Sequence, residues 1–345
     1  MRFDPFCCSS YLSYRYIVEP GRSWRDGVTP EFPVVSEKDR YEVGSAAQVL
    51  DALRALVADV VPSETGVLLS GGIDSAILAA LLPRGTRAYT VRFVAEGATD
   101  ESEAAARYAE HCGLNHTVVE VTWEDYRAAV PVLMQRKASP LHAVEVGLYH
   151  LARAASADGL SKLIVGNGAD STFGGLDKLL SRDWSFDAFV ERYTFLDPRR
   201  ALREPVLIRS PFERYRRGEG IDVNGFLKVI HGLGIVQSFE NGIQAGGCAV
   251  SAPYEQLWLS EPLDIPRIRA GESKYMLREV FNQLYPHLPV APKLAFVRPM
   301  GVWMKDWRGP SRPEFLPDLD ISGFSAEQRW LTWCLEQFMN VTEGV

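Results

Sequence analysis

The stretch VLLSGGIDSA, from Val67 to Ala76, decides the expected fold of this 345-residue chain. An apolar run ends in Ser-Gly-Gly at residues 70–72, and a helix-forming run begins directly after it. Glycines lack a Cβ, so their backbone N–H groups approach an anion closely, and the following helix N-terminus then holds phosphate. The carboxylate of Asp74 would repel phosphate unless a divalent cation lies between them, which suits Mg²⁺. A strand–helix turn without a ligand is the simpler alternative for an isolated Gly-Gly pair.

The residues on either side of this turn alternate between short apolar runs and helical patterns. Continuous apolar strands separated by helices predict a parallel twisted sheet with helices on both faces. Before the turn, residues 46–61 show the spacing of an amphipathic helix that Pro62 closes. The expected strands are residues 66–70, 87–93, 116–122 and 162–166, and the expected helices are residues 73–82, 100–113, 123–135 and 144–158.

From about residue 175 the strand pattern fades. The expected helices there are SFDAFVERYTFL (185–196), EQLWLSE (255–261), SKYMLREVFNQLY (273–285) and AEQRWLTWCLEQFM (326–339). The sequence therefore divides into an irregular lead-in (1–45), an α/β core (46–175) that contains the turn, and a mostly helical region (176–345) that is expected to complete the site at this turn.

Composition excludes several classes of protein. A formal net charge of −7 and a pI of about 5.5 argue against a broad nucleic-acid-binding face. No uncharged apolar run reaches the roughly 18 residues that a membrane span needs, and the N-terminus lacks a secretory pattern. Five cysteines without a CxxC pair argue against a disulfide framework and a zinc ribbon. A cytoplasmic enzyme that binds neither membrane nor nucleic acid is the expectation.

As a unit, LLSGGIDSA resembles the pyrophosphate-binding loop of the ATP pyrophosphatase superfamily. Members of that superfamily cleave ATP between the α- and β-phosphates and adenylate a substrate. The resemblance implies ATP and Mg²⁺ as cofactors and a fold like that of the adenine nucleotide α-hydrolases.

Three further stretches resemble the synthetase domain of asparagine synthetases, in the same order and with similar spacing. These are VGNGADSTFGG (Val165–Gly175), ESKYMLREVF (Glu272–Phe281) and PKLAFVRPMGVW (Pro292–Trp303). The lead-in SSYLSYRYI is similar to the stretch that follows the glutaminase domain in full-length enzymes. The similarity covers about residues 10–308, and the combination is far more specific than any one piece.

The resemblance assigns roles to individual residues. It implies Mg²⁺ ligation by Asp74 and Asp170, although Asp170 also suits a helix N-cap. It implies that Lys293 stabilises the charged intermediates and that Lys274 lies near pyrophosphate, where an ordinary surface lysine is the alternative. The nucleotide site is expected to contain Ser70, Gly71, Gly72, Asp74, Ser75, Thr90, Val91, Gly166, Asn167 and Gly168, with the backbone of Thr90 and Val91 beside adenine.

Two departures from the family concern the source of nitrogen and the base. No glutaminase domain fits before residue 10, so nitrogen is expected from free ammonia, an amine or a separate glutaminase or pathway partner. Asparagine synthetases have Glu at the position of Asn167, and the related β-lactam synthetases have Tyr paired with a downstream Glu. An amide cannot accept a proton at neutral pH, so Asn167 is expected to orient a substrate. Glu240, 13 residues before Pro253, is the candidate base, with a solvated or helix-capping Glu as the alternative.

A third departure concerns the acid substrate. The family pattern E-x-R-x-P-F is Ala-Val-Ser-Ala-Pro-Tyr at residues 249–254, without either charge. If the family arginine helps to recognise a carboxylate or phosphate, this chain must do so with another residue. Aspartate is therefore not the expected substrate.

The preferred hypothesis is an ATP-dependent amide-forming ligase of specialised metabolism. It would adenylate a small-molecule carboxylate and pass the acyl group to ammonia or an amine. One alternative is an intramolecular cyclase of the β-lactam synthetase type, which Asn167 in place of Tyr weakens. Another is an inactive ATP-binding partner subunit, against which the retention of Asp74, Asp170 and Lys293 argues. A tRNA sulfur transferase would need core cysteines and a basic face, and the sequence shows neither.

Overall fold

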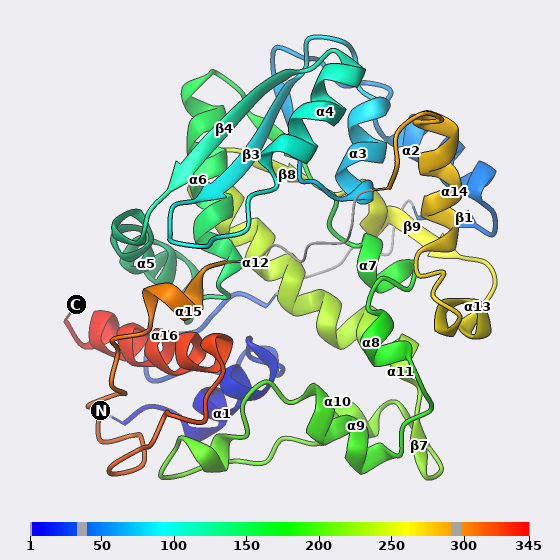
Figure 1. Cartoon of the computed structure of the whole chain (residues 1–345). Coiled ribbons are helices and arrows are strands. Elements are labelled where there is room, and N and C mark those ends of the chain that lie inside the picture. Colours follow the sequence, from blue (N-terminus) through cyan, green and yellow to red (C-terminus); the bar gives the residue numbers. More distant parts are fainter. Residues whose placement is uncertain (1, 33–39, 291–297, 345) are drawn as a thin grey trace.

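The computed structural model describes residues 2–32, 40–290 and 298–344 (Figure 1). The predicted catalytic Lys293 lies outside these residues, as do Pro292 and Phe296 of the segment that contains it.

Within the described residues, five strands form one parallel sheet in the order β4-β3-β2-β5-β8. All four residues of the central strand β2 are buried, as expected for a parallel sheet covered on both faces. The predicted parallel α/β fold is confirmed, with one addition, because β8 comes from the region predicted to be mostly helical. The bounds are β2 (Thr65–Leu68), β3 (Arg87–Phe93), β4 (Asn115–Val121), β5 (Lys162–Ile164) and β8 (Ala249–Ser251).

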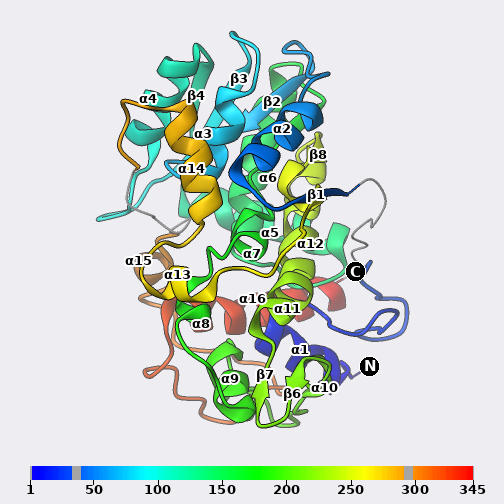
Figure 2. The same ribbon diagram turned by 90° about the vertical axis from the view of Figure 1, so that its right-hand side faces the viewer.

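Helices cover both faces of the sheet (Figures 1 and 2). One layer packs α14 against α2 and α3, with α4 beside α3; the other packs α5, α6 and α12 together. Helices from beyond residue 175 thus complete both layers. The bounds are α2 (Ala46–Leu56), α3 (Ile73–Ala80), α4 (Ser102–Cys112), α5 (Trp123–Lys137), α6 (Val144–Ala157), α12 (Gly232–Ala245) and α14 (Tyr275–Leu284).

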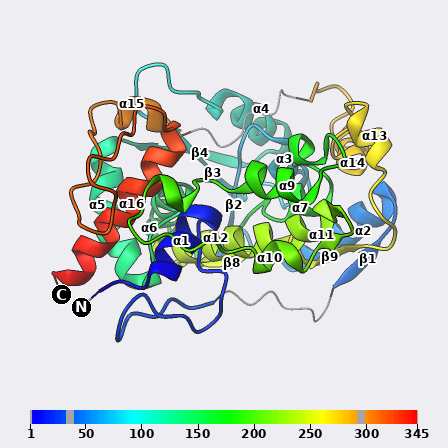
Figure 3. The ribbon, with the colours of Figure 1, turned by 90° about the horizontal axis from the view of Figure 1, so that it is seen from below.

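Most of the remaining helices form a second lobe below the sheet in Figure 1, and their apolar side chains share core clusters with the sheet and its helices. Helix α16 packs against α1 and α5, and the two ends of the chain lie close together (Figures 1 and 3). The helices of this lobe and its connections are α1 (Pro5–Tyr14), α7 (Ala169–Thr172), α8 (Asp177–Leu180), α9 (Phe186–Tyr193), η1 (Pro198–Arg200), α10 (Ser210–Glu213), α11 (Val223–Phe226), the π-helix η2 (Leu227–His231), η3 (Pro253–Gln256), α13 (Ile265–Arg269), α15 (Met300–Trp303) and α16 (Ala326–Glu343). Two short strands, β6 (Arg216–Arg217) and β7 (Gly220–Ile221), form a hairpin.

The lead-in, expected to be irregular, contains the ten-residue helix α1. Asp4 caps this helix through a side-chain oxygen that accepts from the N–H of Phe6, and Pro5 occupies its first turn. Residues 7–14 are all buried, serines included. A helix buried on every side shows no amphipathic period, so the pattern that reveals other helices is absent here.

The prediction of a helix over EQLWLSE (255–261) is wrong. This segment ends the 3₁₀ turn η3 and continues as β9 (Leu257–Leu259), which pairs in parallel with β1 (Tyr41–Val43). A three-residue strand is too short to show an alternating pattern. Its partner lies far away in the sequence, so tertiary pairing overrides the local preference.

The sheet and the second lobe meet at a cavity of about 540 Å³ at the carboxyl ends of β2, β3 and β5. Its walls come from the lead-in, the sheet, α7, α12 and the residues around α14. In the part of the chain that the structure describes, every helix is too short or too polar to cross a membrane.

Candidate active site

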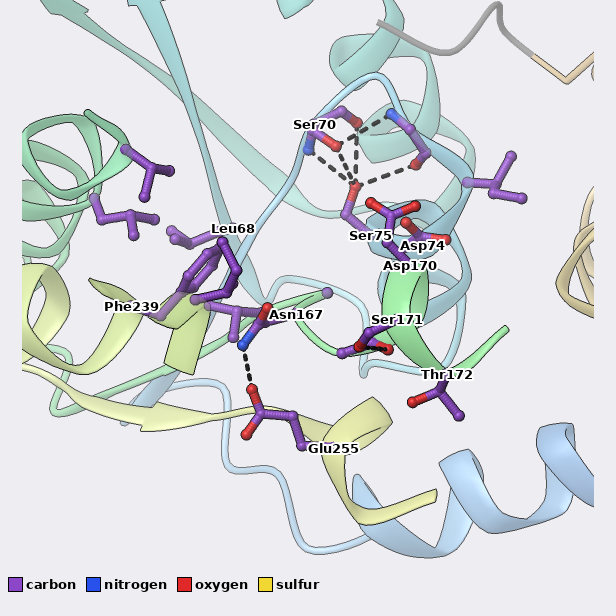
Figure 4. Close-up of a pocket in the computed structure, with 18 of the residues that line it drawn as sticks. Leu68, Ser70, Asp74, Ser75, Asn167, Asp170, Ser171, Thr172, Phe239 and Glu255 are labelled. Atoms are coloured by element: carbon purple, nitrogen blue, oxygen red, sulfur yellow. Dashed lines mark hydrogen bonds between the residues drawn. The ribbon is translucent and has the colours of Figure 1, made fainter. Parts of the chain in front are cut away.

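The cavity collects most of the residues predicted to bind nucleotide, and Figure 4 shows a large part of this group. Lys274, from the loop before α14, lies with them, whereas Gly71 and Glu240 are not among the lining residues. The predicted residues that line the cavity are Ser70, Gly72, Asp74, Ser75, Thr90, Val91, Gly166, Asn167, Gly168, Asp170 and Lys274.

Internal hydrogen bonds hold the Ser-Gly-Gly turn in shape (Figure 4). The backbone N–H of Ser70 donates to Ser75 Oγ at 3.0 Å, and the two serine hydroxyls lie 2.9 Å apart. The N–H of Gly72 donates to Ser70 Oγ at 3.1 Å, directly before the first residue of α3. The turn is therefore preorganised at a helix N-terminus, where the helix dipole favours an anion.

A carboxylate already contacts this turn. The backbone N–H of Gly71 donates to Glu101 Oε2 at 3.2 Å. Burial raises the pKa of Glu101, and the nearby Asp100 raises it further, while the hydrogen bond from Gly71 lowers it. The contact shows that the amide of Gly71 is aimed at an acceptor. In the sequence, Glu101 has the pattern of a residue in the first turn of a helix.

The second feature that bears on phosphate binding is a buried lysine between two aspartates. Lys274 Nζ lies 2.5 Å from Asp74 Oδ2 and 2.7 Å from Asp170 Oδ1, and Lys274 is only 5% exposed. Burial alone would lower the pKa of Lys274, but the two carboxylates outweigh it and the net pKa is raised. A Cβ at Gly175 would collide with both Asp170 and Lys274, so this close approach needs glycine there.

The aspartate pair fits a nucleotide-bound Mg²⁺. Mg²⁺ usually takes one or two carboxylates and completes its octahedral shell with phosphate oxygens and water. Asp74 and Asp170 both reach one cationic atom, the ammonium of Lys274, which shows that their oxygens converge on a single position. Among the described residues, no cluster of three or more His, Cys, Asp or Glu side chains is suited to a metal, so the nucleotide would supply the further ligands.

An apolar wall lies beside the end of β3. The pairing of β2 with β3 stops at Leu68 and Tyr89, so β3 continues past the end of its neighbour. Thr90 Oγ1 donates to the carbonyl of Leu69 at 2.6 Å. An apolar slot with an open strand edge suits a flat heterocycle such as adenine. The other apolar lining residues here are Leu68, Val144, Leu148, Leu151 and Phe239.

An acid that the sequence did not reveal faces Asn167. Asn167 Nδ2 donates a short hydrogen bond to Glu255 Oε1 (Figure 4). Burial first, and then the charge of Glu240, raise the pKa of Glu255 to about 7, although the bond from Asn167 opposes this shift. Gly168 has a φ of +91°, and a Cβ there would lie 2.9 Å from Glu255. A carboxyl group with a pKa near neutrality is suited to move protons.

Glu240, the base expected from the sequence, lies on α12. It is absent from the lining, and it acts on the site through its charge, which raises the pKa of Glu255. The sequence does place an acidic residue, Glu255, directly after Pro253-Tyr254 of the family segment. Glu255 was not considered as a base, because this stretch was expected to form a helix.

The sheet, the preorganised turn, the convergent aspartates and the apolar slot together define a nucleotide-binding α/β protein. The sequence profile of the asparagine synthase family matches residues 46–221, which include β2 to β5 and the turn. The chain belongs to the asparagine synthase family.

Curated relatives are similar over part of the chain. A protein named Amidase chry2 from Gibberella zeae is 30% identical over 158 residues, covering 41% of this chain and 23% of that protein. A putative glutamine-hydrolysing asparagine synthetase from Mycobacterium tuberculosis is 31% identical over 149 residues, covering 41% and 22%. The matches thus span about a quarter of the length of these relatives.

Solved structures show weak similarity. An NH3-dependent NAD synthetase from Campylobacter jejuni matches with a TM-score of 0.26 and 18% identity, covering 37% of this chain and 58% of the other. The U34-tRNA thiolase NcsA from Methanococcus maripaludis matches with a TM-score of 0.29 and 14% identity, covering 72% and 82%.

Proposed function

We propose that this protein is an ATP-dependent amide-forming ligase. A substrate carboxylate attacks the α-phosphorus of ATP, the bond to the β-phosphate breaks, and pyrophosphate leaves. Ammonia or an amine then attacks the acyl carbon of the adenylate, loses a proton, and AMP departs as the amide forms. Membership in the asparagine synthase family supports this proposal, and the observation that carries it is the Asp74–Lys274–Asp170 cluster beside the turn at residues 70–72.

Each group at the site has a part in this chemistry. The backbone N–H groups at the start of α3, with the hydroxyls of Ser70 and Ser75 beside them, would hold the β- and γ-phosphates. Bound Mg²⁺, held by Asp74 and Asp170, would neutralise charge that develops on the leaving pyrophosphate. Lys274 is close enough to exchange its aspartate partners for phosphate oxygens when MgATP binds. The carboxylate of Glu255 would accept the proton that the attacking amine releases.

The nature of the two substrates forms a further part of the proposal. Residues 249–254 carry neither charge of the family pattern, and an asparagine stands at position 167, so the substrate side differs from that of an aspartate-using enzyme. These differences support a role in specialised metabolism, with ammonia, an amine or a separate glutaminase as the nitrogen source.

ATP–pyrophosphate exchange with a broad panel of carboxylic acids tests the proposed function. At least one acid is expected to promote exchange and the release of AMP. If none does so while ATP binds the folded protein, or if the products are ADP and orthophosphate, the ligase proposal fails and a non-catalytic ATP-binding subunit becomes the better explanation. The product mass separates ligation of two substrates from cyclisation of one, because cyclisation removes water from a single molecule.

Replacing Lys293 by alanine is expected to lower turnover by about 10²- to 10³-fold, the usual cost of losing one donor aimed at the transition state. ATP binding should change little, because such a charge matters less in the ground state. Single-turnover kinetics and nucleotide titration measure the two effects. Equal losses in binding and turnover would contradict this role for Lys293, and Lys305→Ala is the control on an exposed lysine of the same region.

A further inference from the structure

One part of the cavity wall carries cations that the proposed chemistry does not use. Arg40, Lys228 and Trp258 line the cavity there, and Trp258 is 41% exposed, so this part of the wall borders on solvent. These three residues form the cationic rim. Lys228 belongs to the π-helix η2, a kind of helix that is often found at functional sites. Because the rim would hold a substrate of the proposed ligase, its role rests on that function.

Both cations of the rim lie over one aromatic ring. Lys228 Nζ is 2.7 Å from the centroid of the Trp258 ring, and the guanidinium carbon of Arg40 is 5.0 Å from a centroid of the same side chain. An aromatic face attracts a cation but does not neutralise it. Within residues 2–32, 40–290 and 298–344, Lys228 takes part in no ion pair. Burial, and then the charge of Arg40, lower the pKa of Lys228 to about 8, so most of the ammonium stays protonated at pH 7.

The rim adjoins the proposed base. Trp258 lies on β9, which follows the turn η3 that carries Glu255. Helix α7 contacts η3, β9 and η2, so the elements that carry Glu255, Trp258 and Lys228 meet around it. Leu257, which separates the turn from Trp258 in the chain, also lines the cavity and offers an apolar surface to a short carbon chain. A nitrogen at Glu255 and an anion at the rim can therefore belong to one small molecule.

The charge of the rim bears on the nature of the nitrogen donor. Ammonia and simple amines are mostly protonated at neutral pH, and positive charge at the rim repels these cations. In an amino acid, a carboxylate offsets the charge of the ammonium group. That carboxylate is attracted to the rim, where Lys228 can donate charge-assisted hydrogen bonds to it.

We propose that the nitrogen donor is an amino acid whose carboxylate binds Lys228, with Arg40 beside it, while its amino group faces Glu255. The amino nitrogen attacks the acyl carbon of the adenylate, and Glu255 takes the proton that this nitrogen releases. The bond from the acyl carbon to the phosphate oxygen breaks, and AMP departs with its electron pair. The carboxylate at the rim stays unchanged, so the product is an N-acyl amino acid and ammonia is a poor substrate.

Amide formation with the acid that supports ATP–pyrophosphate exchange tests the proposal. The protein amino acids, β-alanine and γ-aminobutyrate are screened as donors beside ammonium chloride, and the best donor is compared with its primary amide at equal concentrations of the unprotonated amine. The primary amide is expected to have a KM about 10-fold higher, the usual effect of losing one charge-assisted hydrogen bond. Lys228→Gln should raise the KM of the amino acid by a similar factor and leave the KM of its amide unchanged. Lys228→Arg, which keeps the charge, should stay close to the wild type, and Lys178→Gln, on an exposed lysine of α8, is the matched control.

ATP–pyrophosphate exchange separates the rim from the sites of the other substrates. Adenylation precedes attack by the amine, so Lys228→Gln should leave the KM values of ATP and of the acid in exchange unchanged. A rise in the KM of the acid would assign the rim to the acid substrate. Equal use of ammonia, or of the amide, and the amino acid would show that the rim binds no carboxylate of the donor. Either result overturns the proposal and leaves the ligase function in place. If Lys228→Gln does not fold, Arg40→Gln takes its place.

A binding measurement distinguishes failure of this proposal from failure of the ligase function. Calorimetric titration with the same amino acids uses protein saturated with Mg²⁺ and the α,β-methylene analogue of ATP, which cannot release pyrophosphate. At least one amino acid should bind, with an affinity that Lys228→Gln weakens about 10-fold and Lys178→Gln leaves unchanged. If binding shows this pattern but no acid supports exchange, the rim site stands and the ligase function is refuted. If no amino acid binds or reacts, the rim site is refuted.

Discussion

Asp74→Asn is expected to lower Mg²⁺-dependent AMP formation by about 10³-fold or more, because a metal-held charge contributes several kcal/mol to the transition state. The side chain keeps its shape but loses the charge that faces both Lys274 and the expected Mg²⁺. Initial rates of AMP formation across a Mg²⁺ titration measure the effect. The residual activity should also need a higher Mg²⁺ concentration, which a purely structural defect would not cause.

Asp51→Asn is the matched control, because Asp51 is an exposed aspartate of α2 that pairs with Arg54 on the surface. Both variants should melt within a few degrees of the wild type. Near-normal turnover of Asp74→Asn at low Mg²⁺ would contradict the metal-binding role. A large drop in melting temperature for Asp74→Asn would assign the loss to folding, and Asp170→Asn would then test the same metal position.

Glu255→Gln is expected to lower amide formation by about 10²- to 10⁴-fold, the usual contribution of a positioned base. Adenylation precedes the proton transfer, so ATP–pyrophosphate exchange should stay close to normal. Glutamine has nearly the same volume as glutamate and keeps an oxygen that can accept from Asn167 Nδ2, which preserves the local packing. Parallel loss of exchange and amide formation would show that Glu255 supports the adenylation step, contrary to the proposed role.

The pH dependence gives a second test of the same residue. A base works in its deprotonated form, and the pKa of Glu255 is raised to about 7, so the rate of amide formation should rise with pH through about 7 and level off above it. The charge of Glu240 is one cause of that raised pKa. Glu240→Gln removes this charge, so the rise should move to lower pH while the plateau rate is kept. If the rate of amide formation rises at the same pH in Glu240→Gln as in the wild type, the rise does not reflect deprotonation of Glu255.

Local sequence was sufficient for strands β2 to β5 and for the turn at residues 70–72, but not for β8. Strands β2 to β5 and the helices between them fall where the apolar and helical patterns predict, because each pattern reports burial over a few neighbouring residues. Asp74 was expected from its place directly after that turn, whereas Asp170 was assigned from the resemblance of residues 165–175 to the family motif. Their convergence on Lys274 follows from the parallel sheet, whose strand ends meet at one edge.

The structure alone revealed the acid and the cation that complete the cavity. Glu255 comes from a turn that the sequence presents as helix, and its partner Asn167 follows a different strand. Lys228 and Trp258 come from different elements, and only the packing of those elements brings the ammonium over the indole ring. Glu240 had the residue type expected of a base but is not among the residues that line the cavity, and it acts through its charge on Glu255.

The sequence by itself determined where each strand ends and which polar residues follow it, because those features depend on neighbours along the chain. Tertiary structure decided which distant side chains share the cavity and how far burial shifts their pKa values. Burial and charge pairing depend on the packing of the second lobe against the sheet, and no pattern within one segment encodes that packing.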